Sequence, residues 1–189
     1  GVRFGKRGSI AVDADFRTSV PTIFAAGDVV GPPGLASVSV EQGRTAASAA
    51  CGTAYLSGSQ WASPSGVYTI PEVAWVGLSE EQAQAQGMTY EVGRAGFTAN
   101  SRANIAGDTG GLVKLIFDPG SRRILGAHVV GEIASEMIHV AQAVIQLNGN
   151  LDYFVHATFN IPTWSDAFKM AAFDGLGKLQ PSTLERVQD

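Results

Sequence analysis

Apolar and polar residues follow strand-like patterns at four places beyond residue 66. Alternation with a period of two, or a short apolar run between turn signals, predicts a β-strand. Two of the apolar runs are joined by Asp118–Ser121, whose sequence Asp-Pro-Gly-Ser is a strong signal for a hairpin turn. The predicted strands cover residues 67–76, 90–97, 112–117 and 124–130.

Helical patterns lie between and after these strands. Ser79 begins a short helix, with Gln82 in the capping-box position and Gly87 at its end. A longer helix is predicted over residues 132–147 and a last one over residues 163–176. The longer helix has two apolar stripes, which predicts that it is buried on two sides. The stripes consist of Ile133, Met137, Val140, Val144 and Leu147, and of Ala134, Ile138, Ala141 and Ile145.

The order of these elements predicts an α+β fold for residues 67–189. In this fold class an antiparallel sheet carries helices on one face. A separate, turn-rich stretch over residues 52–66 contains several Gly and Ser residues and a Pro, so we expect it to connect this domain to the preceding part.

The preceding part, residues 1–51, has a different pattern. Two short strands are predicted at 9–13 and 21–26, followed by an Ala-rich helix at 37–50 that ends at Gly52. Two strands and one helix cannot bury a core of their own. We therefore expect residues 1–51 to be the tail of a larger α/β dinucleotide-binding domain whose front half lies outside this chain.

Composition narrows the function classes. The 189 residues are 45% hydrophobic and 16% charged, as in an ordinary soluble protein. The net charge of −4, without a basic cluster, argues against nucleic acid as a partner. No apolar run approaches the ~20 residues that span a bilayer, and the first residues lack the apolar core of a signal peptide. We expect a cytoplasmic protein that does not interact with membranes.

Cysteine and histidine offer little for catalysis or metal binding. Cys51 is the only cysteine, so the chain forms neither an internal disulfide nor a Cys-x-x-Cys pair. His128, His139 and His156 do not have metal-ligand spacing. His128 lies between apolar residues of a predicted strand, so we expect a structural histidine whose hydrogen bonds are satisfied.

The segment Thr18–Asp28 has the pattern of an apolar strand that stops at Gly27-Asp28, ahead of the Ala-rich helix. In open α/β sheets, ligands bind beyond the carboxyl ends of the strands. An Asp placed there can accept hydrogen bonds from ligand hydroxyls, and the Gly before it permits a tight turn. On these residues alone, an acid in a surface turn is the favoured interpretation.

Four blocks of the chain, in this order, resemble the pyridine nucleotide–disulfide oxidoreductases, which are flavoproteins with two dinucleotide-binding domains. The resemblance implies the last segment of an FAD-binding domain, followed by a C-terminal dimerisation domain. Residues 67–189 would then form a homodimer. The blocks are Thr18–Asp28, Tyr68–Gly77, Ile124–Gly131 and Phe159–Asp166.

The same resemblance implies which residues contact the cofactor. In this family the acid of the Gly-Asp motif holds the ribityl chain of FAD, and the start of the following helix faces the pyrimidine side of the flavin. Capping of that helix is the alternative role for Ser37. No catalytic residue and no metal site are expected in this chain. The implied FAD-binding residues are Gly27, Asp28, Leu35, Ala36 and Ser37.

Within the family, residues 90–97, 101–102 and 152–154 resemble the soluble, FAD-containing NAD(P) transhydrogenases most. In relatives that act on dithiols, a His precedes the Pro of the fourth block as general base, and a Glu five residues later orients it. Here those positions hold Ile161 and Asp166. An isoleucine cannot exchange a proton, and soluble transhydrogenases also lack that His.

The resemblance thus implies an FAD enzyme that transfers hydride between NADPH and NAD⁺. One alternative is a lipoamide-dehydrogenase-like or mercuric-reductase-like flavoenzyme, which would need a cysteine pair upstream of this chain. Another is a non-catalytic association module. For the 189 residues alone we expect dimerisation without catalysis and without retained FAD, because the Gly-rich pyrophosphate-binding fingerprint is not among them.

Overall fold

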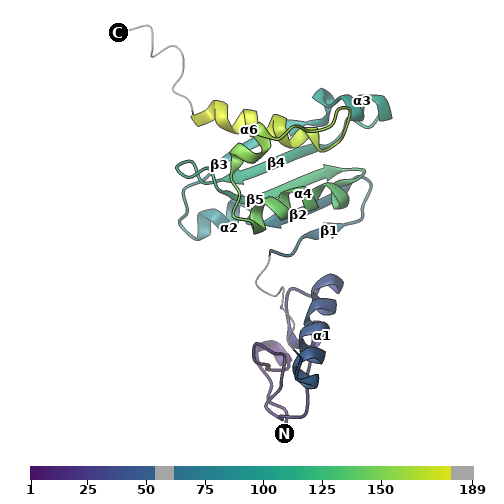
Figure 1. Ribbon diagram of the computed structural model, residues 1–189, viewed down its shortest axis with the longest axis vertical. Coiled ribbons are helices and arrows are strands. Elements are labelled where there is room, and N and C mark those ends of the chain that lie inside the picture. The colour runs from purple at the N-terminus through teal and green to yellow at the C-terminus, as the bar shows by residue number, and fades with distance from the viewer. Residues whose placement is uncertain (54–61, 180–189) are drawn as a thin grey trace. The chain divides into compact units, whose positions relative to one another are not determined.

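The computed structural model describes residues 1–53 and 62–179 (Figure 1). The chain divides into two compact units, Gly1–Trp61 and Ala62–Asp189. The boundary between the units lies within the predicted connection, residues 52–66. Within the described ranges, no helix is long and apolar enough to cross a membrane.

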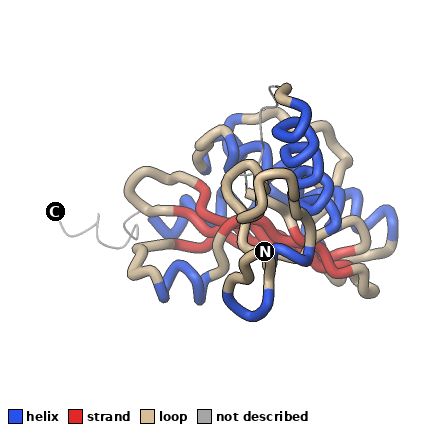
Figure 2. The backbone as a smooth tube through the Cα atoms, turned by 90° about the horizontal axis from the view of Figure 1, so that it is seen from below, coloured by secondary structure: helices blue, strands red, loops and turns tan. Residues whose placement is uncertain are grey.

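An antiparallel sheet of five strands, counted over the described residues, forms the second unit. The strands follow the order β1-β2-β5-β4-β3 and make one continuous layer (Figure 2). Their pairing confirms the predicted antiparallel sheet, including the hairpin at Asp118–Ser121 between β4 and β5. The strands are β1 (Ser65–Val67), β2 (Glu72–Gly77), β3 (Glu91–Gly96), β4 (Leu112–Phe117) and β5 (Ile124–Gly131).

The first predicted strand, residues 67–76, is wrong as a single element. It consists of parts of β1 and β2, which pair with each other around the loop Tyr68–Pro71. Pro71 has no N–H group to donate to a neighbouring strand, so the ladder stops there. Tyr68 and Ile70 in this loop are 79% and 103% exposed.

Two helices cover one face of the sheet, as predicted. Helix α4 (Ala134–Gln146) contacts β2 and β5, and α6 (Asp166–Leu179) contacts β3 and β4 (Figure 1). The buried side chains that the sheet turns toward these helices alternate along each strand, as the pleat requires. They are Ala74, Val76, Val113, Leu115, Ala127 and Val129.

Helix α6 lies directly on the backbone of β3 at Gly93. A Cβ atom at Gly93 would lie 2.1 Å from the carbonyl oxygen of Ala171 and 3.0 Å from the amide nitrogen of Gly175. Backbone atoms cannot move aside as a flexible side chain can. The two glycines therefore permit an approach that no other residue at position 93 allows.

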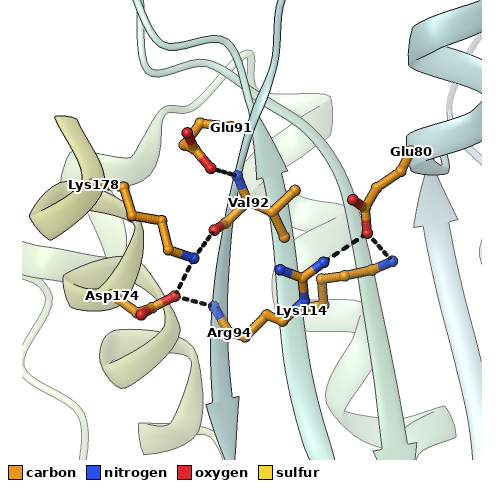
Figure 3. Close-up of polar contacts among 7 residues, drawn as sticks. All are labelled: Glu80, Glu91, Val92, Arg94, Lys114, Asp174 and Lys178. Atoms are coloured by element: carbon orange, nitrogen blue, oxygen red, sulfur yellow. Dashed lines mark hydrogen bonds and ion pairs between the residues drawn. The ribbon is translucent and has the colours of Figure 1, made fainter.

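Side chains of α6 also satisfy the backbone of β3, which is an edge strand (Figure 3). The Asp174 carboxylate accepts a hydrogen bond from the Arg94 amide at 2.8 Å. The Lys178 ammonium donates to the Val92 carbonyl at 2.6 Å and to Asp174 at 2.8 Å. These bonds occupy the Arg94 amide and the Val92 carbonyl, so fewer polar groups of this edge strand are open to pairing with another strand.

The short helix α2 (Glu80–Ala85) lies over the opposite face of the sheet. The predicted capping box is confirmed, because Ser79 and Gln82 each bond the backbone N–H of the other. The carboxylate of Glu80 accepts hydrogen bonds from Lys114 at 2.8 Å and from Arg94 at 2.9 Å (Figure 3). The neighbouring ammonium of Lys114 holds the pKa of Glu80 below its usual value.

His128 is paired in register with Trp75 on one side and with Lys114 on the other. It is a structural histidine, but the expectation that its hydrogen bonds are satisfied is wrong, because its Nδ1 atom is buried without a partner. Burial, together with the charge of Lys114, lowers the pKa of His128 to about 4, while Glu80 and Glu81 act weakly in the opposite direction.

Within the single chain, helix α4 is buried on one side only, so burial of its second side, which would need a partner chain, stays a prediction. The buried side comprises Ala134, Met137, Ile138, Ala141 and Val144. The stripe of apolar residues next to it is half-buried at Ile133 and Val140. Leu147, just after the helix, is 80% exposed. Nothing in the described part of the chain covers this leucine.

Two short helices were not predicted. They are α3 (Ser101–Ala106) and α5 (Leu151–His156), and each is too short to show a helical period. A signal existed for α3, since Asn100 caps its first turn through the Ala103 amide and Gly107 ends it in the left-handed region. In α5, Phe154 stacks on Phe168 of α6 with ring centroids 5.3 Å apart.

In the first unit, the predicted helix is confirmed as α1 (Ala36–Cys51), with Gly52 in the left-handed conformation at its end. The predicted strands at 9–13 and 21–26 are wrong, since each contributes only an isolated bridge, at Ile10 and at Phe24. A strand needs a neighbour along its length, and the described residues of this unit supply none. Short 3₁₀ helices complete the structure at Lys6–Gly8, Asp28–Val30 and, in the second unit, Phe97–Ala99.

We predict that Gly93→Ala lowers the free energy of unfolding by about 1–3 kcal/mol or more, because the added methyl group clashes with the backbone of α6. The control is Gly96→Ala in the same strand, where the nearest atom would be 3.6 Å away. That variant should stay within about 0.5 kcal/mol of the parent chain. Chemical denaturation measures both, and equal effects would contradict the close approach.

We also predict that stability falls as the pH drops from about 6.5 toward 4. The pKa of His128 is lower in the folded chain than its usual 6.5, so the unfolded chain binds a proton first. Glu80, whose pKa is also lowered, adds to the loss only below its usual value of 4.5. In His128→Gln, the unfolding free energy measured by chemical denaturation should change less between pH 7 and pH 5 than in the parent chain. If the unfolding free energy of that variant depends on pH as strongly as that of the parent, His128 is not the source of the pH dependence.

Candidate functional site

The predicted Gly27-Asp28 motif forms a tight turn in the first unit. Gly27 has φ 83° and ψ −157°, a conformation that side-chain-bearing residues avoid, and it precedes the 3₁₀ turn Asp28–Val30. The Val30 amide donates to the Gly27 carbonyl at 3.0 Å, and the Ile10 amide donates to the Val29 carbonyl at 2.8 Å. One hydrogen bond therefore closes the turn itself, and the other fixes it to the segment at Ile10.

The other predicted contact residues lie at the start of α1. Leu35 is the N-cap residue, and Ala36 and Ser37 are the first two residues of the helix. The alternative that Ser37 caps the helix does not match this placement, since the N-cap position makes no side-chain hydrogen bond. Amides in the first turn of an uncapped helix point outward unpaired and carry a partial positive charge.

The structure brings the turn and the helix start together. A Cβ atom built on Gly34, just before Leu35, would lie 3.8 Å from Oδ1 of Asp28. One turn and a half into α1, the side chain of Gln42 accepts a hydrogen bond from the Gly27 amide at 2.7 Å. No motif in the sequence marks Gln42 as part of a site. The signal available was a long polar side chain inside an Ala-rich helix.

The Asp28 carboxylate is free to bind a ligand. Its residue is exposed, and it takes part in no side-chain hydrogen bond or ion pair with the described residues. An ionised carboxylate is an acceptor only, and it bonds hydroxyl groups well. The site thus presents an acceptor for hydroxyls next to a set of unpaired N–H donors.

In the second unit, the two positions at which this chain differs from the dithiol-handling relatives lie near the start of α6. Ile161 is 63% exposed in the loop ahead of that helix, and Asp166 is its first residue. His156 ends α5, and His139 on α4 bonds the Gln142 side chain at 2.8 Å through Nδ1. No described group of three or more His, Cys, Asp or Glu could hold a metal ion.

A pocket of about 580 Å³ lies at the loop Tyr68–Pro71, in a part of the second unit where the sequence analysis assigned no ligand. Three carboxylates line it, those of Glu72, Asp108 and Glu132. The Glu72 carboxylate accepts hydrogen bonds from the amide and hydroxyl of Ser135, which lower its pKa. Oδ2 of Asp108 is buried without a partner.

Comparison with protein families gives two matches. The pyridine nucleotide-disulphide oxidoreductase dimerisation domain matches residues 63–172. The pyridine nucleotide-disulphide oxidoreductase domain matches residues 1–43. The two matches fall in the second and the first unit respectively.

Curated relatives cover almost the whole chain. The soluble pyridine nucleotide transhydrogenase of Pseudomonas putida is 45% identical over 186 residues, which are 95% of this chain and 39% of the relative. The protein of the same name from Pseudomonas aeruginosa is 42% identical over the same share. The chain therefore spans about two fifths of the length of these relatives, at 39%.

Solved structures show the same fold. LpdA from Mycobacterium tuberculosis is 28% identical with a TM-score of 0.81, over 96% of this chain and 39% of that one. The HOCl-induced flavoprotein disulfide reductase RclA from Escherichia coli is 27% identical with a TM-score of 0.80, over 89% of this chain and 39% of that one. The α+β fold with its antiparallel sheet is thus confirmed.

Proposed function

Because this chain belongs to the pyridine nucleotide–disulphide oxidoreductase family, we propose that it is part of an FAD-dependent enzyme that transfers hydride between NADPH and NAD⁺. The relatives' name, soluble pyridine nucleotide transhydrogenase, supports this choice within the family. The observation that carries the proposal is the free Asp28 carboxylate beside the uncapped start of α1.

The residues of the first unit fit FAD. Asp28 would accept hydrogen bonds from the ribityl hydroxyls, and Gly27 would let the backbone approach the cofactor closely. The amides around Leu35, Ala36 and Ser37 would face the pyrimidine side of the flavin, where their partial positive charge favours an electron-rich ring. The remaining contacts would come from the part of the relatives that this chain does not span.

The chemistry of hydride transfer would belong to the bound flavin, and this chain would bind and orient it. Such a reaction needs no general base from the second unit. The exposed Ile161, which can neither accept nor donate a proton, agrees with this role. We propose no catalytic residue in this chain, and no catalysis or retained FAD for the 189 residues alone.

The second unit would make a homodimer. The family's domain over residues 63–172 is a dimerisation domain, and it carries apolar side chains that its own fold leaves exposed. A two-fold contact between identical surfaces is the commonest way to cover such side chains. We also propose that the chain consists of an FAD-domain segment (residues 1–51), a connection (52–66) and a dimerisation domain (67–189), and that the protein is cytoplasmic. The exposed side chains include Leu147, Tyr153, Met170 and Phe173.

A disulfide reductase is the second candidate function. It is favoured by the structural similarity to RclA, whose name says that it reduces disulfides. The residues of this chain argue against it, because Ile161 occupies the position of the general base in dithiol-handling relatives. A lipoamide-dehydrogenase-like or mercuric-reductase-like enzyme meets the same objection.

We predict that Asp28→Ala in the full-length protein weakens FAD binding roughly ten- to a hundredfold. A hydrogen bond to a charged group contributes about 1.5–3 kcal/mol, which corresponds to that range of affinity. Titration of the apoprotein with FAD, followed by flavin fluorescence, measures the dissociation constant.

The matched control is Asp15→Ala, which removes the same charge from another exposed position of the first unit. It should leave FAD affinity unchanged. If Asp28→Ala folds and binds FAD as tightly as this control, Asp28 does not belong to the cofactor site.

We predict that the full-length enzyme transfers hydride between nicotinamides and fails with dihydrolipoamide. A positioned general base is worth about 10²–10⁴ in rate, and Ile161 supplies none of it. Steady-state assays with each substrate on the purified protein test this. Robust dihydrolipoamide oxidation would show that the disulfide-reductase branch of the family is correct.

A further inference from the structure

Gln42 connects the two parts of the proposed cofactor site. Its Oε1 atom accepts a hydrogen bond from the Gly27 amide at 2.7 Å, so a side chain of α1 holds the residue directly before Asp28. Gly27 also packs closely on the same helix, because a Cβ atom there would lie 3.3 Å from Oγ of Ser39. The turn thus rests on the first part of α1.

The position of Gln42 along α1 determines what this contact fixes. Gln42 lies six positions after Ala36, which is about 9 Å along a helix axis. The turn therefore lies alongside the first turns of α1, with Asp28 toward the helix start. The closeness of Oδ1 of Asp28 to Gly34, 3.8 Å from its built Cβ, agrees with this direction. The Gln42 bond sets the spacing between the Asp28 carboxylate and the free amides of the helix.

We propose that Gln42 is a positioning residue for cofactor binding. It touches no ligand, and it holds the acceptor for the ribityl hydroxyls at a fixed distance from the donors that face the flavin ring. This inference rests on the proposed FAD site. A cofactor that spans two contacts binds more tightly when their spacing is set in advance, since ordering the site during binding costs affinity.

The test compares variants of the full-length protein in FAD titrations of the apoprotein. Gln42→Met keeps the length of the side chain and removes the acceptor, and it should weaken FAD binding about five- to tenfold. Gln42→Glu keeps an acceptor and should bind FAD like the parent. Gln42→Asn keeps the amide but is one methylene shorter. It replaces Gln42→Met in the titration, with the same expected loss of FAD affinity, if Gln42→Met does not fold.

Two measurements separate positioning from a general structural role. Ser48→Ala removes a hydrogen bond to the Thr53 carbonyl at the far end of the same helix, and it should leave FAD affinity unchanged. In the Asp28→Ala background, Gln42→Met should cause no further loss of affinity, because it acts through Asp28.

The outcomes distinguish this inference from the proposed function. Unchanged FAD affinity in Gln42→Met, or in Gln42→Asn, overturns the role of Gln42. If Asp28→Ala still lowers FAD affinity in that case, the proposed FAD site stands without it. An equal loss from Gln42→Met with and without Asp28 also overturns it, since the effect is then general. An unaffected Asp28→Ala overturns the site itself, and the role of Gln42 with it.

Discussion

The second unit depends on one close contact, the approach of α6 to the backbone of β3 at Gly93. Because no side chain fits between them, α6 reaches far enough over the edge strand for Asp174 and Lys178 to bond its free polar groups (Figure 3). Phe168 of the same helix stacks on Phe154 of α5. One residue without a side chain therefore sets how closely α6 lies on the sheet at β3.

This arrangement supports the proposal that the second unit associates with a second copy of itself. Its core is apolar, and the Val92 carbonyl and the Arg94 amide of β3 are occupied by hydrogen bonds from and to α6. Exposed apolar side chains lie at Leu147 after α4 and in the loop around Ile70. The first unit is the reverse case, with the free carboxylate of Asp28 and the uncapped α1 facing solvent. The two units would thus divide the work between dimerisation and cofactor binding.

The sequence predicted elements well where a pattern was long or chemically explicit. Short-range sequence patterns were enough to predict the capping box at Ser79, the hairpin at Asp118–Ser121 and the helix start near Ala36. The errors had non-local causes. The strands at 9–13 and 21–26 lack partners along their length, and the first apolar stripe of α4 is only partly covered within one chain, at Ile133, Val140 and Leu147. The contacts of Gly93 and Gln42 were invisible because they depend on which segments meet in space.

The central claim is that the second unit dimerises through apolar surface that its own fold leaves uncovered. Sedimentation equilibrium of this chain at micromolar concentration tests it most directly, with circular dichroism to show that the sheet is folded. The account predicts a particle of twice the mass of one chain. A folded particle with the mass of a single chain at that concentration would contradict it.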